Sequence, residues 1–400
     1  MEQITAGDLE QMFADVADAG TYGCFEYLGT AIGLHTDEAD LLNWFSAFFG
    51  GYFTVTANER IDAAVYSSRD PAVFRRLKEW ATSSGRPRSA DDTEYVVDAH
   101  HRIIYSREVD DAKGDVDETC FVLSTSDRSV LVASPGALED RQKAVKRSLR
   151  NWMKLLFMER GWLPFHSAAC VWNDTGICIL GGKYAGKTST LVNLLARPGA
   201  RLLTNDTLFL RDGGDVLEGC GFPNKAGLRI GALAAYPKLV DWIETTTDSF
   251  YPQIDAETFR HAVATTPVDE LGSRSEKIVL LSSELAQQFD VPIQHVATME
   301  VFLVVRFDPS LERSRLTPVT DPQQINHCLA ASFRSLSKEK QDFLQDSFDF
   351  GGDTVQAAFD ALVEKFASRV AVVELHQNAR TNEHSAELVA ELTQQLRARA

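Results

Sequence analysis

One stretch of the sequence combines residue types that bind phosphate groups. It fits the pattern G-x-x-x-x-G-K-[ST] and continues into a serine, in the order Gly181, Gly182, Lys183, Tyr184, Ala185, Gly186, Lys187, Thr188 and Ser189. Glycine lets successive backbone N–H groups point inward, so such a loop binds a triphosphate through amide donors and the positive end of the following helix. Lys187 would bridge the outer phosphates, and Thr188 would offer its hydroxyl to Mg²⁺. We therefore expect ATP and Mg²⁺ to bind here.

The flanks of this stretch predict that it connects a strand to a helix. Residues 177–180 form a continuous apolar run that is typical of a buried strand. After the loop, apolar residues recur at helical spacing until Arg197-Pro198-Gly199. The alternative, a structural glycine turn with a surface lysine, fits these flanks less well.

A carboxylate follows soon after the loop. Residues 200–204 are predicted to form a second short strand, and Asn205-Asp206 come directly after it. In the common nucleotide hydrolases the metal-binding acid comes later, because another crossover intervenes. Upstream, His166 begins an apolar strand that the turn at residues 173–176 joins to the strand of the loop. We therefore expect the loop to be entered from an antiparallel hairpin, with Asp206 available to the metal.

This order of elements resembles the catalytic domain of HPr kinase/phosphorylase and the wider group of kinases that share its phosphoenolpyruvate-carboxykinase-like core. The resemblance rests on His166, residues 181–189 and residues 201–206, and more loosely on residues 221–229 and the strand near residues 301–306. It implies an α/β fold with an HPr-kinase C-terminal-like mixed sheet and a P-loop. It also implies Mg²⁺-dependent transfer of the γ-phosphate of ATP to a serine hydroxyl.

The resemblance assigns further side chains to the site. His166 would face the outer phosphate and shuttle a proton or bind phosphate, unless it is only a core residue. Glu218 lies where the family has a second metal-associated acid. Lys225 and Arg229 would offset the charge on the transferring phosphate, unless they are ordinary surface cations.

Two positions depart from the family pattern. Tyr184 stands where the family loop usually has a glycine, and Asn205 stands where the family has the first of two aspartates. An amide cannot accept the proton of an acceptor hydroxyl. Either Asp206 serves both the metal and the hydroxyl, or His166 or the acceptor supplies the base, or the chain binds nucleotide without transferring phosphate.

Composition narrows the classes of function. The 400 residues are 44% hydrophobic, contain no apolar run long enough to span a bilayer, and start without the features of a secretory signal. Six scattered cysteines without C-x-x-C spacing indicate neither a zinc site nor a disulfide framework. A net charge of −17 argues against nucleic acid as a partner. We expect a cytoplasmic protein with no nucleic-acid or membrane partner, and a homo-oligomer is an open possibility.

The sequence predicts two domains. Residues 1–135 mix helix and strand patterns and are expected to form an α+β accessory domain that selects the acceptor or mediates assembly. Residues 136–400 would form the P-loop kinase domain, with a polar insertion near residues 241–277 and a C-terminal helix.

The leading hypothesis is an ATP- and Mg²⁺-dependent kinase for a hydroxyl group. The resemblance alone supplies a serine of a peptide or small protein as the acceptor, and a sugar or metabolite is an alternative. A nucleotide-binding regulator without turnover is a second hypothesis, motivated by Asn205 and Tyr184. Decarboxylating carboxykinase chemistry is disfavoured, because no His/Lys/Asp set for a second metal is found.

Overall fold

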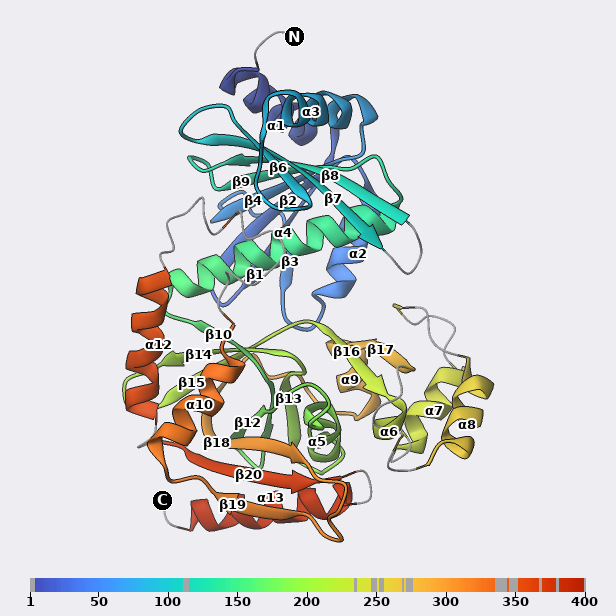
Figure 1. Cartoon of the computed structure of the whole chain (residues 1–400), viewed down its shortest axis with the longest axis vertical. Helices are drawn as coiled ribbons and strands as arrows, with labels where there is room; N and C mark the ends of the chain where they lie inside the picture. The colour runs from blue at the N-terminus through green and yellow to red at the C-terminus, as the bar shows by residue number, and fades with distance from the viewer. Residues whose placement is uncertain are drawn as a thin grey trace. The chain divides into compact units, whose positions relative to one another are not determined.

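The computed structural model describes residues 4–110, 115–233, 236–245, 250–251, 255–267, 270, 276–334, 344, 352–366, 369–378 and 381–398. The described residues form two compact units, one within residues 1–160 and the other within residues 161–335 and 352–400. Each unit has its own sheet and hydrophobic core (Figure 1). In the described part of the chain, no helix combines the length and the apolar character needed to cross a membrane.

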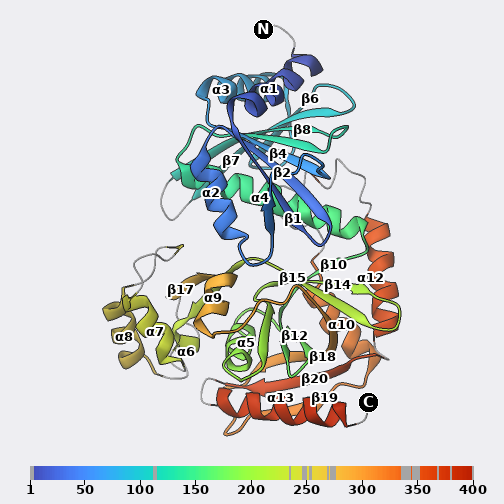
Figure 2. The same ribbon diagram turned by 180° about the vertical axis from the view of Figure 1, so that it is seen from behind.

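The first unit is built on a mixed sheet in the strand order β3-β1-β2-β4-β9-β8-β7-β6-β5. Its strands are β1 (Thr21–Tyr27), β2 (Thr30–Thr36), β3 (Thr54–Thr56), β4 (Ala63–Ser68), β5 (Arg86–Pro87), β6 (Asp92–Val96), β7 (His101–Asp110), β8 (Asp115–Ser124) and β9 (Ser129–Ala133). Its helices are α1 (Ala6–Ala19), α2 (Ala39–Phe48), α3 (Pro71–Ser84) and α4 (Leu138–Glu159). Helices α1 and α3 cover one face of the sheet, and α2 and α4 cover the other (Figures 1 and 2).

One expectation for this part of the chain needs correction. The predicted domain boundary at residues 135/136 moves to 160/161, because α4 packs against β2, β4 and β9 and completes the core of the first unit. The first unit mixes helices and strands, and at the centre of its mostly antiparallel sheet β2, β4 and β9 run parallel. Parallel neighbours require crossover connections, and those connections contain the helices α2 and α3.

The second unit contains a mixed sheet in the order β10-β14-β15-β18-β12-β11-β13, with β20 on β18 and β19 on β20, and a separate pair β16-β17. The strands are β10 (Leu163–His166), β11 (Ala168–Trp172), β12 (Thr175–Leu180), β13 (Ala200–Thr204), β14 (Thr207–Asp212), β15 (Leu217–Phe222), β16 (Lys225–Arg229), β17 (Lys277–Leu281), β18 (Val296–Phe307), β19 (Arg315–Pro318) and β20 (Ala371–Gln377). The helices are α5 (Lys187–Leu195), α6 (Ile230–Leu233), α7 (Pro237–Thr245), α8 (Ala256–Thr265), α9 (Ser282–Gln288), α10 (Pro322–Ser332), α12 (Gly352–Phe366) and α13 (Asn382–Arg397).

Alternate residues along the central strands of this sheet enter two different cores. On β12, Ile177 and Ile179 face the core that α5 and α13 complete, whereas Cys178 and Leu180 face the core of α10 and α12. A strand buried on both faces reads as a continuous apolar run, which is why residues 177–180 were recognisable. The expected mixed α/β sheet and C-terminal helix are confirmed.

The expected hairpin before the glycine-rich stretch is confirmed, but His166 does not begin its first strand: His166 ends β10, and the hairpin strand β11 starts at Ala168. Strands β11 and β12 pair antiparallel with Trp172 opposite Thr175, and the connecting residues Asn173 and Asp174 have φ angles of 47° and 59°. Asparagine and aspartate tolerate this left-handed conformation, which a tight two-residue hairpin turn requires. The polar insertion expected near residues 241–277 contains α8, beside α6 and α7 (Figure 1); residues 246–249, 252–254, 268–269 and 271–275 lie outside the described residues.

Gly176 lies where β12 closely approaches its parallel neighbour β18, and a substitution there tests how much room the two strands leave. A Cβ atom at this position would lie 2.0 Å from the carbonyl oxygen of Thr298, and the other nearest atoms also belong to the backbone. We therefore expect Gly176→Ala to lower the free energy of unfolding by about 1–3 kcal/mol, because backbone cannot move aside as a flexible side chain can. Urea unfolding measures the change, with Gly182→Ala as the control, since a Cβ there meets no atom within 4 Å. Equal stabilities for the two variants would contradict the prediction.

Candidate functional site

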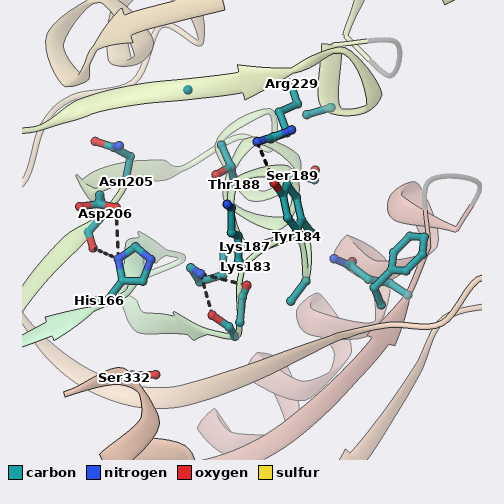
Figure 3. A pocket seen from close by; sticks show the side chains of 18 of the residues that line it. His166, Lys183, Tyr184, Lys187, Thr188, Ser189, Asn205, Asp206, Arg229 and Ser332 are labelled. Carbon is teal, nitrogen blue, oxygen red and sulfur yellow. Dashed lines mark hydrogen bonds and ion pairs between the residues drawn. The ribbon is translucent and has the colours of Figure 1, made fainter. Parts of the chain in front are cut away.

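Three segments of the second unit meet at one edge of its sheet. Strand β12 continues directly into the glycine-rich loop, residues 181–188, which leads into α5. Asn205 and Asp206 form the connection between β13 and β14. His166, at the end of β10, pairs with Thr207, the first residue of β14. Strands β12 and β13 both pair antiparallel with β11, so they run in the same direction and end at the same edge of the sheet. The loop after β12, the connection after β13 and His166 therefore lie close together (Figure 3).

These segments line a cavity of about 600 Å³. Most residues expected from the sequence contribute to it, namely His166, all of residues 181–189, Asn205, Asp206 and Arg229. The lining contains the cations of Lys183, Lys187 and Arg229, and Asp206 is the acid that faces them. A positively charged cavity in a chain of net charge −17 favours an anionic ligand.

The glycine-rich loop has a backbone that suits phosphate oxygens. Gly186 precedes α5 with a φ of 102°, a backbone conformation that favours glycine, and a Cβ there would lie 2.8 Å from Nε2 of Gln377. Lys187, Thr188 and Ser189 form the first turn of α5 and line the cavity. The N–H groups of a first helical turn lack carbonyl partners within the helix and carry partial positive charge, so this end of α5 suits an anion.

Lys187 lies inside the loop rather than on the surface. Its Nζ atom donates to the carbonyl oxygens of Gly181 at 2.6 Å and Gly182 at 3.3 Å. Burial lowers the pKa of Lys187, the charge of Arg334 acts in the same direction, and the nearby carboxylate of Asp206 opposes them. Lys187 and Asp206 are therefore close enough to interact across the cavity.

Asp206 and His166 lie within hydrogen-bonding distance of each other. Nδ1 of His166 lies 3.2 Å from Oδ1 of Asp206 and 3.2 Å from its backbone oxygen. The other carboxylate oxygen accepts hydrogen bonds from Nδ2 of Asn224 at 2.7 Å and from the hydroxyl of Thr207 at 3.1 Å. With two acceptors in front of it, Nδ1 is the protonated nitrogen, so Nε2 of His166 carries the lone pair.

The environment keeps the Asp206 carboxyl ionised. Burial alone would raise its pKa, but the hydrogen bond and charge of His166, the charge of Arg334 and the hydrogen bond from Asn224 together hold the pKa well below its ordinary value. A general base works best when its pKa is near the operating pH. Asp206 is therefore better suited to bind a cation and to orient His166 than to accept a proton.

Asn205 has a structural role that a carboxylate cannot fill. Its Nδ2 donates to the backbone oxygen of Lys225 at 3.0 Å, and its Oδ1 accepts from the hydroxyl of Ser282 at 2.8 Å. The side chain thus links the β13–β14 connection to β16 and α9, although Asn205 also lines the cavity. An aspartate would present an oxygen to the Lys225 carbonyl, where the amide presents a donor.

Tyr184 places an aromatic ring at the cavity among cations. The guanidinium carbon of Arg229 lies 4.5 Å from the ring centre, and Nζ of Lys183 lies 5.0 Å from it. Nη2 of Arg229 is 3.5 Å from the tyrosine hydroxyl, and Lys183 and Arg229 lower the pKa of that hydroxyl. Tyr184 has a φ of 68°, so the loop has at this position the left-handed backbone that glycine adopts more easily. The ring fastens the loop to Arg229 at the end of β16.

Two residues expected in the site do not reach the cavity. Lys225 extends toward Tyr251, with Nζ 5.9 Å from the ring centre. Glu218 pairs with Arg211, whose Nη2 is 2.5 Å from Oε2. On the paired strands β14 and β15, Glu218 is opposite Arg211 while Phe222 is opposite Thr207, so Glu218 lies about 13 Å along the sheet from the connection that bears Asp206.

Sequence patterns did not indicate several residues of the site. Asn224 follows β15 and binds Asp206, and Arg334 follows α10 and acts electrostatically on Lys187 and Asp206. Phe307, Ser332 and Gln377 line the cavity from the ends of β18, α10 and β20. None belongs to a motif, although Asn224 lies within residues 221–229, on which the resemblance loosely rests. The only available signal was the position of Phe307 and Gln377 at the carboxyl ends of strands, where α/β proteins bind ligands.

Replacing Asn205 by aspartate tests the structural role of the amide. We expect Asn205→Asp to lower the free energy of unfolding by about 1–3 kcal/mol at pH 7, because a buried carboxylate would face the Lys225 carbonyl. A carboxyl in this position has a raised pKa and is stable when protonated, so the loss should grow as pH rises above about 4. Urea unfolding between pH 4 and 8 measures it, with Asn43→Asp on the exposed side of α2 as the control for added charge. A pH-independent loss equal to that of the control would contradict the prediction.

The depressed pKa of Asp206 predicts an acid-dependent contribution to stability. Because the folded-state value lies below the unfolded value of about 3.9, the contribution is present above about pH 4 and disappears as pH falls. We expect Asp206→Asn to lower the free energy of unfolding by about 1–3 kcal/mol at pH 7, and the difference between the two proteins to shrink as pH falls below about 4 toward the low folded-state pKa. Urea unfolding of both proteins across this range checks the prediction, which fails if the difference is constant.

Comparisons with known proteins add little to this geometry. No protein family matches the sequence, and no curated protein matches it. Among solved structures, one similar chain is the HPr(Ser) kinase/phosphatase from Coxiella burnetii, which is 10% identical with a TM-score of 0.27, over 58% of this chain and 98% of that chain. A likeness of this size carries neither fold nor activity across, so the function has to follow from the site itself.

Proposed function

We propose that the chain is an ATP- and Mg²⁺-dependent phosphotransferase that moves the γ-phosphate to a hydroxyl group. One observation supports this most directly: the glycine-rich loop with Lys187, the ionised Asp206, and His166 bonded to Asp206 all line one cavity. These are the groups needed to bind a triphosphate, hold a divalent cation and accept a proton.

The loop side of the cavity supplies the groups for the phosphates. Lys187 would exchange the carbonyl oxygens of Gly181 and Gly182 for phosphate oxygens, which carry more negative charge. The amides of the loop and the first turn of α5 add neutral donors. Arg229 and Lys183 lie at the same cavity, where they would offset charge on the outer phosphate as it transfers.

The residues present fit a magnesium ion. Thr188 and Asp206 both line the cavity and offer the oxygen ligands that Mg²⁺ prefers, and Mg²⁺ usually takes few protein ligands beside water and phosphate. Among the described residues, no group of three or more His, Cys, Asp or Glu side chains is arranged to hold a metal ion. Bound there, the ion would neutralise charge on the phosphates. Glu218 has no part in the proposed site, because it pairs with Arg211.

His166 is the proposed base, and Asp206 positions it. The acceptor oxygen attacks the γ-phosphorus, the bond from that phosphorus to the β–γ bridging oxygen breaks, and ADP leaves with the bond's electrons. The hydroxyl proton passes to Nε2 of His166, whose Nδ1 proton remains bonded to Asp206. This assignment resolves the departure at Asn205, because no second carboxylate is then required.

The acceptor is the least constrained part of the proposal. The sequence resemblance favours a serine of a peptide or small protein. A sugar or metabolite hydroxyl is the alternative acceptor. A nucleotide-binding regulator without turnover is the alternative function. Mass spectrometry of candidate peptides and metabolites, incubated with the protein, ATP and Mg²⁺, separates these possibilities.

Two variants test the proposed roles separately. We expect Lys187→Ala to abolish ATP binding, with Lys225→Ala as a matched lysine control that binds normally because its side chain does not line the cavity. We expect His166→Asn to bind ATP normally but to lower kcat about 10²–10⁴-fold, because asparagine can still donate to Asp206 but cannot accept the proton.

Calorimetry measures binding, and the phosphate-sized mass gain of an acceptor measures transfer. Full turnover in His166→Asn would remove His166 from the mechanism. ATP binding without hydrolysis or any phosphorylated acceptor would favour the regulator.

A further inference from the structure

The glycine-rich loop follows a central strand of the sheet, so the ends of other strands lie on either side of it. Across the sheet the order is β20, β18, β12, β11 and β13, so β12 and its loop are central. Asp206 follows β13 on one side. Phe307 ends β18 on the other side, about 14 Å from β13 across three strand spacings. The cavity therefore continues past the loop, away from the proposed site of transfer.

On this second side, β12, β18 and β20 run parallel and end at the same edge. Val305 and Gln377 touch the loop there, since a Cβ on Gly186 would lie 3.7 Å from Val305 and 2.8 Å from Gln377. Phe307 is two residues beyond Val305 on the same face of β18, about 7 Å farther from the loop. In a nucleotide, the ribose separates the phosphates from the base by a similar distance.

Phe307 is exposed although it is a large apolar residue. Its exposed fraction is 45%, and it is one of the residues that line the cavity. The backbone around it is fixed: the N–H of Asp308 donates to the carbonyl of Gln377 at 3.0 Å, and Nδ2 of Asn378 donates to the carbonyls of Asp308 at 3.1 Å and Leu311 at 2.8 Å. An exposed aromatic ring on a rigid strand end is suited to bind another flat ring.

We propose that the base of the nucleotide stacks on Phe307, an inference that rests on the proposed function because the phosphates must occupy the loop. The ring would then select a nucleoside triphosphate over an inorganic polyphosphate. Stacking uses the flat face that every base has, so Phe307 adds affinity for the base without reading its edge.

The test compares two ligands with the same chain of phosphates. Dissociation constants of ATP and of inorganic tripolyphosphate, each with Mg²⁺, are measured by calorimetry for the full chain and for Phe307→Ala, Phe307→Trp and Val216→Ala. Val216 is an exposed apolar residue between β14 and β15 that does not line the cavity, so its variant is the control. Removing the ring on which the base stacks is expected to raise the dissociation constant of ATP about 5- to 100-fold.

The proposal requires that Phe307→Ala weakens ATP by this factor and leaves tripolyphosphate unchanged, while Phe307→Trp and Val216→Ala bind ATP as the unmodified chain does. Equal loss for both ligands would show that Phe307 supports the loop and would overturn the proposal. No loss for ATP would also overturn it. If the unmodified chain binds tripolyphosphate as tightly as ATP, stacking is excluded but the phosphate site stands; if it binds neither, the proposed function fails as well.

Discussion

The hydrogen bonds that keep Asp206 ionised determine how the site is built. A carboxylate that is only a quarter exposed is stable in its charged form only when other groups compensate it. His166 from β10, Thr207 from β14 and Asn224 from the end of β15 supply that compensation, so these strands must pair in one register. The same requirement separates the two residues of the connection. Position 206 needs a negative charge among donors, and position 205 needs an amide that donates to one neighbour and accepts from another.

Much of the second unit could be predicted because its signals are local. The apolar run of β12, the turn at residues 173–176 and the helical spacing of α5 each depend on a few adjacent residues, and all three are confirmed. The accessory unit was harder. Its parallel strands are joined by long connections, and short strand patterns do not reveal which strands pair. Helix α4 was placed in the wrong domain because its own pattern says nothing about the sheet that it covers.

The errors within the site have the same origin. Lys225 and Arg229 lie on one short strand, so sequence spacing alone could not show that only Arg229 lines the cavity. Glu218 was assigned by resemblance, yet the register of β14 and β15 places it beside Arg211. Arg334 reaches the site because the segment after α10 joins β10, with the Arg334 N–H bonded to the carbonyl of Pro164. That contact joins residues that are distant in the sequence, and no sequence motif indicates it.

The strand order of the mixed sheet explains which part of the site could be predicted from the sequence. On the side of Asp206, the strands β10 to β14 are consecutive in the sequence and pair antiparallel among themselves, so His166, the loop and Asp206 come from one continuous stretch. On the side of Phe307, the parallel strands β18 and β20 are separated by long connections, and their ends meet only in the folded sheet. A motif search therefore finds the residues proposed for transfer and misses those proposed for the base. Because these two sides belong to different strands, substitutions at one can change ligand choice while the hydrogen bonds around Asp206 stay intact.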